Sequence, residues 1–560
     1  MFNQTPPTLY EWRRAASLLV ALSLFTATAS GQQAAAVAVA PAPTLSEAER
    51  TAVAHVRAES IRELTAALSA PEMQGRGTGQ AGGERAAQFI AERFRQLGLK
   101  PAGERGTYFQ TIKFREFQVT PESQFTLDGA PLKMGDEFAA LPPHSGDEDL
   151  SGRMVFVGFG IQNKTRDDFK NLNLRGKVVV LISGPPRGVT EKEWKKMDAP
   201  LLIARNIVMS GAAALVLTNT GTEQTPYGML ADYLMRRQLE LDGEEQPPRE
   251  LPPFVAVSDA AAEKLFAGSG TTYADAFGRA NRGEHVSREL KPAAKIKIKF
   301  KDARVTGSNV AAVLEGSDPK LKEEAVVYTA HYDAWGAGSD GRVFHGAADN
   351  ALGVAEMLAV AEAFMKSATT PRRSIIFLAM TGEEHGLYGA EHWTKNPTWK
   401  IKQVTANFNF DGMGTEIHGP LRKAVGFGME HSDLGAVLQS AAQASGIEIV
   451  PDPMPEERTF VRSDHYAFVK RGVPALMLLG APDVSKEKLI ELVKEYQKKA
   501  YHLPGDTVSE SWNWEGPRGL AQLGLVVGMR VANADAMPAW LPSSIYNRER
   551  GTNREAPKEP

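Results

Sequence analysis

Apolar and polar positions follow different periods in successive parts of the chain, and each period predicts its own kind of element. Over residues 84–97, apolar side chains recur with the period of a helix, and Gly98 follows where a helix-ending glycine is expected. After residue 150 this period gives way to short, continuous apolar runs at 154–159, 177–183, 212–217 and 254–257. With the helical stretch at 203–210, these runs predict a compact α/β unit.

Two stretches beside this unit have patterns of their own. Residues 220–252 are polar and rich in proline, which favours a surface excursion. Residues 295–301 alternate strictly between lysine and apolar side chains, which predicts a half-buried strand with one solvated face. The lysines are therefore expected to face solvent rather than nucleic acid.

Strand-like and helix-like runs then alternate. The predicted strands are 325–330, 374–380, 404–410 and 474–479, and a helix is predicted near 354–364. This order indicates an α/β fold class, a mixed, mostly parallel sheet flanked by helices. We expect residues 46–148 and 289–540 to form one domain, into which 149–288 are inserted.

Metal-binding side-chain types follow these strands. A solitary Asp after a strand is usually a turn or cap residue, and paired Glu residues suit the first turn of a helix. Here, however, such residues recur at successive strand ends, and adjacent buried carboxylates are costly unless a cation compensates them. Since the carboxyl ends of parallel strands meet at one edge, a metal site is expected there. The residues at the strand ends are His331, Asp333, Glu383, Glu384 and Asp411. Asp349 follows in a loop after the first of these strands, and Tyr501 and His502 lie near the end of the chain.

Composition limits the chemistry further. The 560 residues favour two to four domains, and a formal net charge of −3 gives no electrostatic case for binding nucleic acid. The chain has no cysteine, which excludes disulfides, thiol nucleophiles and cysteine-ligated zinc. Catalysis must therefore rest on other side chains, with or without a metal held by oxygen and nitrogen.

The first residues have the pattern of a targeting segment. Arg13 and Arg14 precede an apolar run at 15–25, and the small residues Ala27, Thr28 and Ala29 follow it. This pattern predicts a signal peptide at 1–30, although an uncleaved membrane anchor is the alternative. A loose linker is expected at 31–45 and a disordered tail at 541–560. We therefore expect an exported protein, periplasmic or secreted, with no membrane attachment after signal cleavage.

The strand-end residues also lie in motifs that resemble those of the M28 peptidases, the co-catalytic zinc aminopeptidases. The motifs occur in the family's order and are HYDAWG, GAADNALGVAEMLAVAEAF, TGEEHGLYGAEHW, NFDGMG, RSDHYAF and YHLPGDT. The earlier GRGTG stretch resembles the opening of the same family. Residues 150–285, with LRGKVVV and GAAAL, resemble a protease-associated (PA) domain. The resemblance implies a phosphorylase/hydrolase-like zinc peptidase fold with a PA-like insert.

When the family's site residues are assigned to the matching motif positions of this chain, the resemblance implies two Zn²⁺ ions per chain. One would be held by His331, Asp349 and Asp411, and the other by Asp349, Glu384 and His502, with Asp349 as the bridge. Asp333 would hold the His331 ring from behind. Glu383 would be the general base for a metal-bridging water, and Tyr501 would stabilise the oxyanion unless it only packs.

The implied function is release of N-terminal residues from peptides with a free N-terminus. A glutamate-carboxypeptidase-like hydrolase is one alternative, although only about 50 residues follow Thr507, too few for the helical dimerisation domain of those enzymes. A cyclase with one zinc is disfavoured by the full two-metal set. A non-catalytic binding module on the same fold is the third alternative. The sequence leaves the preferred N-terminal residue, the oligomeric state and the native metal open.

Overall fold

The computed structural model describes residues 43–141, 147–164, 166–190, 193–194, 199–221, 226–243, 253–338, 341–412 and 414–552. The predicted signal peptide, residues 31–42 of the predicted linker and the last eight residues of the predicted tail lie outside these ranges.

A mixed sheet forms the core, as the sequence predicts. Its central strands β16, β13, β17 and β20 run parallel, whereas β12, β2 and β9 add antiparallel strands at one side. Strands β13, β16 and β17 have seven residues each, and all of them are buried, which explains why the sequence shows continuous apolar runs there. Among the described residues the order is β19 (Glu448–Ile449), β18 (Lys423–Phe427), β20 (Ala475–Ala481), β17 (Val404–Phe410), β13 (Ala325–His331), β16 (Ser374–Met380), β12 (Phe300–Leu314), β2 (Phe109–Val119) and β9 (Gln238–Leu241), with β1 (Lys100–Pro101) paired to β12.

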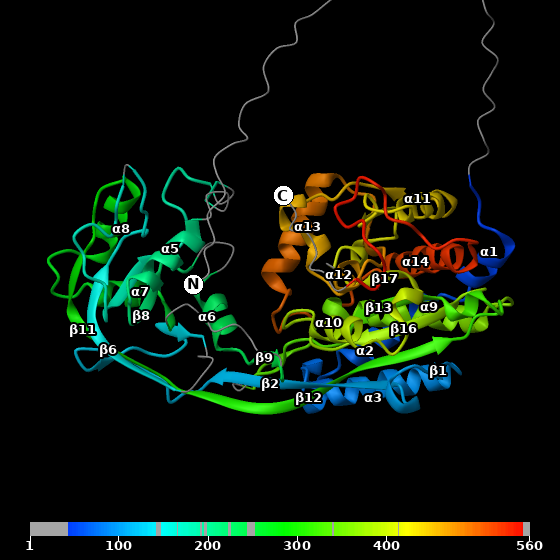
Figure 1. Cartoon of the computed structure of the whole chain (residues 1–560), viewed down its shortest axis with the longest axis horizontal. Coiled ribbons are helices and arrows are strands. Elements are labelled where there is room, and N and C mark those ends of the chain that lie inside the picture. The colour runs from blue at the N-terminus through cyan, green and yellow to red at the C-terminus, as the bar shows by residue number, and fades with distance from the viewer. Residues whose placement is uncertain are drawn as a thin grey trace, which may run out of the picture. The chain divides into compact units, whose positions relative to one another are not determined.

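Helices cover both faces of this sheet (Figure 1). One face packs against α1 (Glu47–Val53), α2 (Ala58–Leu68), α3 (Ala81–Gln96), α9 (Leu352–Lys366), α11 (Leu434–Ala444) and α14 (Glu515–Asn533). The other face packs against α10 (Tyr388–Lys395) and α12 (His465–Lys470) through Trp393 and Phe468. Helix α13 (Lys486–Lys499) leads into the loop that carries Tyr501 and His502.

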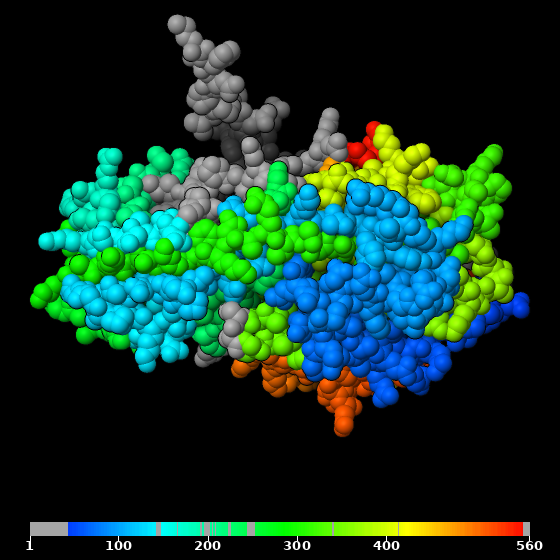
Figure 2. Space-filling model, turned by 90° about the horizontal axis from the view of Figure 1, so that it is seen from below, coloured from blue at the N-terminus to red at the C-terminus, as the bar shows by residue number. Residues whose placement is uncertain are grey.

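The first and last parts of the chain share this sheet. Strand β2 pairs antiparallel with β12, from Val119 opposite Phe300 to Phe109 opposite Val310. Figure 2 shows the early part of the chain, in blue, side by side with the green segment that contains β12. Sheet residues distant in sequence are thus joined by main-chain hydrogen bonds.

A second sheet is built from the intervening residues. Its strands are β4 (Ala130–Pro131), β3 (Gln124–Leu127), β11 (Arg288–Ile298), β6 (Glu148–Phe156), β7 (Val178–Ile182), β8 (Ala214–Thr218), β10 (Phe254–Val257) and β5 (Phe138–Ala140), in that spatial order among the described residues. Helices α5 (Ala199–Met209), α7 (Asp259–Leu265) and α8 (Tyr273–Asn281) accompany them. The sheet therefore extends beyond the predicted limits 149–288 at both ends. It joins the first sheet through the β2–β3 and β11–β12 connections.

Two local expectations differ from the structure. Within 220–252, expected to be a surface excursion, α6 (Tyr227–Met235) and β9 are ordered, and β9 pairs with β2 of the main sheet. Residues 541–552, expected to be disordered, pack instead: the Tyr546 ring is fully buried, and Arg550 donates to the carbonyls of Val404 and Thr405. Both expectations were inferred from polar, proline-containing composition. Composition does not indicate whether a segment pairs its main chain with a distant strand or buries a single aromatic ring.

No helix within the described ranges has both the length and the apolar character needed to cross a membrane.

Candidate metal centre

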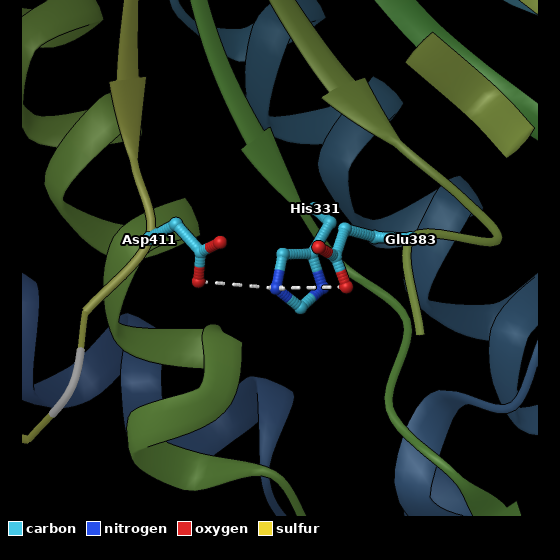
Figure 3. A group of neighbouring side chains, drawn as sticks. All are labelled: His331, Glu383 and Asp411. Atoms are coloured by element: carbon cyan, nitrogen blue, oxygen red, sulfur yellow. Dashed lines mark hydrogen bonds and ion pairs between the residues drawn. The ribbon is translucent and has the colours of Figure 1, made fainter. Parts of the chain in front are cut away.

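Three side chains of the predicted site lie at the ends of three neighbouring parallel strands. Strand β13 lies between β17 and β16, and it ends at His331. Asp411 directly follows β17, and Glu383 lies in the turn after β16. His331 Nε2 is 3.3 Å from Asp411 Oδ1 and 4.0 Å from Glu383 Oε2. Figure 3 shows both carboxylates pointing toward the His331 ring from opposite sides.

Asp349 lies between two histidines. It belongs to a short helical turn, η4 (Ala347–Ala351), at the start of α9, and its peptide bond to Asn350 is cis. Its Oδ1 is 3.2 Å from His331 Nε2, and its Oδ2 is 3.4 Å from His502 Nε2. The two oxygens of one carboxylate thus face two different imidazoles.

His502 completes the cluster from the loop after α13. Its Nε2 lies 2.9 Å from Glu384 Oε2, and its main chain is left-handed, with φ of 56°. The Tyr501 ring stacks on the His502 ring, with 3.7 Å between centroids and an interplanar angle of 24°. Tyr501 therefore lies beside the cluster, and its stacking explains part of its placement.

The cluster fits divalent metal ions. Two groups of three residues each bring one ligand atom within 4.8 Å of the others: His331, Glu383 and Asp411, and Asp349, Glu384 and His502. The second group is one of the two ligand sets that the sequence implies. In the first, Glu383 takes the place expected for Asp349, although Asp349 Oδ1 lies closer to His331 Nε2 than Glu383 Oε2 does. Carboxylate oxygens and imidazole nitrogens are a suitable donor set for zinc.

Charge–charge interactions inside the cluster are strong. Burial raises the pKa of Glu383 well above its ordinary value, and the charge of Asp411 raises it further although His331 opposes it. Burial would lower the pKa of His502, but Glu384 and Asp349 outweigh this and raise it to about 9. Acidic groups outnumber the imidazoles here, so added positive charge would stabilise the arrangement.

Asp333 is placed differently from what the resemblance implies. His331 Nδ1 lies 3.1 Å from the main-chain carbonyl of Asp333 but 3.8 Å from its carboxylate. That carboxylate, fully buried, instead accepts the Glu383 N–H at 3.2 Å. The main chain thus orients the imidazole, and the Asp333 side chain fixes the turn that carries Glu383 and Glu384.

Asp506 also supports the ligands, a role that its sequence position did not predict. Its carboxylate accepts the main-chain N–H groups of Ala348 at 2.9 Å and Asp349 at 3.0 Å, and the Tyr496 hydroxyl at 3.3 Å. It thereby holds the turn that presents Asp349. Its presence in the YHLPGDT motif was the available signal. Similarly, the Ser463 hydroxyl donates to Asp411 Oδ2.

Arg76, from the GRGTG stretch, connects the loops around the cluster. Its guanidinium is fully buried, and burial lowers its pKa to about 10 although nearby carboxylates oppose the shift. It donates to four main-chain carbonyls, those of Tyr332 (2.6 Å), Leu68 (2.8 Å), His345 (2.6 Å) and Gly346 (2.6 Å). The loops after His331 and before Asp349 are therefore joined through one side chain.

A cavity of about 310 Å³ opens onto the cluster. Besides the candidate ligands it is lined by Glu383, Leu387, Val461, Arg462, Met477, Gln497 and Tyr501, among others. Its wall is thus acidic near the cluster and partly apolar elsewhere, with one arginine among the lining residues.

Comparison with known families agrees with this geometry. Residues 309–526, which carry every candidate ligand, match the profile described as Peptidase family M28. This part of the chain is an M28 peptidase domain. Among curated proteins, the vacuolar membrane protease of Pyrenophora tritici-repentis is 35% identical over 118 residues, which are 19% of this chain and 11% of that protein. That of Clavispora lusitaniae is 32% identical over 122 residues, 22% of this chain and 11% of that protein. The similarity to these relatives thus covers only about a tenth of their length.

Solved structures share the fold beyond the M28 domain. An aminopeptidase from Aneurinibacillus sp. strain AM-1 superposes with a TM-score of 0.57 at 18% identity, covering 87% of this chain and 97% of its own. A zinc aminopeptidase from Bacillus subtilis superposes with a TM-score of 0.55 at 20% identity, covering 86% of this chain and 96% of its own. A peptidase M28 precursor from Shewanella amazonensis SB2B superposes with a TM-score of 0.52 at 17% identity, covering 89% of this chain and 98% of its own. At these identities the likeness supports the fold alone.

Proposed function

We propose that this protein is a two-zinc metallopeptidase that removes N-terminal residues from peptides. The observation that carries the proposal is Asp349, whose two oxygens face His331 and His502. One zinc would be held by His331, Asp349 and Asp411, and the other by Asp349, Glu384 and His502. Bound zinc supplies a Lewis acid that polarises a carbonyl and lowers the pKa of water to about 7.

Glu383 has the placement of a general base. It lines the cavity beside the proposed ligands, and its N–H is fixed by Asp333. Its carboxylate would take the proton of the attacking water and return it to the leaving amine. Tyr501, whose ring lies on His502, lines the same cavity, and its hydroxyl is the candidate donor to the developing oxyanion.

The charge of the cavity favours a substrate with a free amine. Four carboxylates, those of Asp349, Glu383, Glu384 and Asp411, line it. Two divalent cations would balance these four charges, and Glu383, which is not a proposed ligand, would be the carboxylate left to face a protonated α-amine. A carboxypeptidase is the second candidate, because Arg462 lines the same cavity and could pair with a C-terminal carboxylate.

Metal removal tests the first part of the proposal. Dialysis against a strong chelator should abolish hydrolysis of aminoacyl chromogenic substrates, and zinc should restore it with two ions bound per chain. Activity that persists after complete metal removal, or a chain that binds no zinc, would contradict the two-zinc site. Retained zinc with no turnover on any peptide would favour the binding module.

Substrates blocked at one end test the specificity. We expect free-amine peptides to be cleaved and N-acetylated peptides to be spared. Cleavage of N-acetylated peptides with a free C-terminus, lost on Arg462→Gln, would instead identify a carboxypeptidase.

We also propose that residues 1–30 direct export, and the support is the charged, apolar and small-residue pattern described above. N-terminal sequencing of protein recovered from outside the cytoplasm should show a chain that lacks residues 1 to about 30. Recovery of the intact N-terminus in the membrane fraction would instead indicate an anchor.

A further inference from the structure

Arg236 contacts the metal-binding loop from a part of the chain 266 residues away. It lies in the short link between α6 and β9, and 10% of its side chain is exposed. Its Nη2 donates to the main-chain carbonyl of His502 at 2.8 Å and to Asp232 Oδ2, also at 2.8 Å. One guanidinium nitrogen thus joins α6 to the residue proposed to hold a zinc ion.

The same side chain organises the aromatic surroundings of the His502 ring. The guanidinium carbon lies 4.2 Å from the Phe344 ring centroid and 4.8 Å from that of Trp335. Trp335 in turn packs edge-on against the His502 ring at 5.4 Å, and Tyr233 of α6 packs on Trp335 at 5.8 Å. The imidazole therefore has Tyr501 stacked on it and Trp335, positioned by α6, packed edge-on against it.

His502 needs such support because of its own main chain. A residue other than glycine in the left-handed region costs on the order of 1 kcal/mol or more, and it persists only when its surroundings hold it. The carbonyl that Arg236 bonds belongs to this left-handed residue. Restraining that carbonyl limits rotation of the main chain that aims Nε2 at Asp349 and Glu384.

We propose that Arg236 is a positioning residue for the metal ion held by Asp349, Glu384 and His502, so that the α6–β9 segment completes one of the two metal sites. This inference rests on the proposed function. It predicts that changes in α6 affect that site and leave the site of His331 and Asp411 intact. Partners of a metal-binding histidine commonly contribute about 10–100-fold to metal affinity.

Zinc titration of four proteins tests this inference. Wild type, Arg236→Gln, Arg342→Gln and His502→Ala are titrated with Zn²⁺ in competition with a chromogenic chelator, and zinc content is measured after dialysis. Arg342 is the matched control, because it also pairs with Asp232 and lies over Phe344, at 5.7 Å, but 49% of its side chain is exposed, against 10% for Arg236. We expect R236Q to weaken one of two zinc ions about 10–100-fold and R342Q to retain both affinities.

The outcomes separate this inference from the function on which it rests. If H502A still binds two zinc ions, the proposed ligand set is wrong. If H502A loses one ion but R236Q binds like wild type, or weakens both ions equally, the role of Arg236 is wrong. Arg236→Lys, which keeps the charge and one donor, is titrated in parallel in case R236Q does not fold. It should weaken the same ion by a smaller factor, and wild-type affinity in R236K with unfolded R236Q would also overturn the inference.

Discussion

At the scale of single residues, side chains that follow strands could be predicted from the sequence, whereas those that bind the main chain could not. His331 and Asp411 lie at strand ends whose apolar runs are plain in the sequence. Asp506 and Arg76 act on N–H and carbonyl groups of segments that only the fold brings near. Every residue type offers a main-chain carbonyl, and all but proline offer an N–H. A segment that receives such a hydrogen bond therefore shows no characteristic residue type in the sequence.

Replacing Glu383 with alanine distinguishes a base from a ligand. We expect Glu383→Ala to retain two zinc ions and to lose turnover by roughly 10²–10⁴-fold, because a general base contributes about that factor. Metal analysis and kcat on an aminoacyl chromogen measure the two effects. Glu384→Ala is the matched comparison and should lose zinc as well. Because Glu383 also lies 4.0 Å from His331 Nε2, loss of zinc in E383A would identify it as a ligand instead.

Replacing Asp506 with asparagine tests its hold on the Asp349 turn. The amide keeps one acceptor but turns an NH₂ group toward one of the two main-chain N–H groups. We expect the free energy of unfolding of metal-free D506N, measured in urea, to be about 1–3 kcal/mol below that of metal-free wild type. This is the usual cost of leaving a buried polar group without a hydrogen-bond partner. Asp535→Asn, which removes only a surface ion pair with Arg372, should change the unfolding free energy by no more than about 0.5 kcal/mol. Equal values for D506N and wild type would contradict this role.

At the scale of elements, fully buried strands were predicted closely, whereas amphipathic strands were predicted only where apolar and polar residues alternate strictly, as at 295–301, which spans the end of β11 and the start of β12. The predicted ranges 374–380 and 404–410 are those of β16 and β17. Strand β2 was missed because charged and polar residues occupy one face and interrupt its apolar positions. Strand β9 was missed because its partner, β2, is distant in the sequence. Continuous apolar runs identify strands buried on both faces, whereas half-solvated strands without strict alternation, such as β2, or with only four residues, such as β9, are recognised only beside their partner.

The contact between α9 and the end of β17 sets the distance between two proposed ligands. A Cβ on Gly353 would lie 2.2 Å from Asn350 Oδ1 and 2.5 Å from the Phe410 carbonyl, which Asn350 Nδ2 also bonds. Gly353→Ala should therefore separate Asp349 from Asp411 and destabilise the fold by about 1–3 kcal/mol. We expect lower zinc affinity together with a lower melting temperature.

A glycine in α8 provides the control for that change. A Cβ on Gly278 meets only the end of a flexible arginine, at 3.7 Å, so Gly278→Ala should be neutral or stabilise helix α8 by about 0.5–1 kcal/mol. Unchanged zinc affinity in G353A would show that the α9–β17 contact does not set the ligand spacing.

At the scale of the whole molecule, the presence of two α/β parts could be predicted, but their joining could not. The sequence indicates a second α/β unit within the first. It does not reveal that β9, from within the inserted residues, extends the first sheet, or that β3 and β5 belong to the second. These pairings depend on contacts between residues far apart in sequence. A linear pattern contains no information on which edge a strand joins.

The interior also contains a pair of carboxyl groups, Glu356 of α9 and Glu416, outside the proposed ligand sets. Both side chains are buried, and burial raises the pKa of Glu416 from 4.5 to about 7. Burial also raises the pKa of Glu356 well above its ordinary value, and the charge of Glu416 adds to the shift. The folded protein therefore binds a proton on Glu416 more tightly than the unfolded chain does.

Stability should consequently fall as the pH rises through this range. The contribution of Glu416 is fully present below pH 4.5 and is lost as the pH rises through about 7, since the unfolded chain releases its proton first. Glu416→Gln, which cannot ionise, should match wild type near pH 4.5 and exceed it by up to about 3 kcal/mol above pH 7. Denaturant unfolding of the metal-free proteins between pH 5 and 9 measures this difference. A constant difference for E416Q would mean that Glu416 does not change its protonation on unfolding.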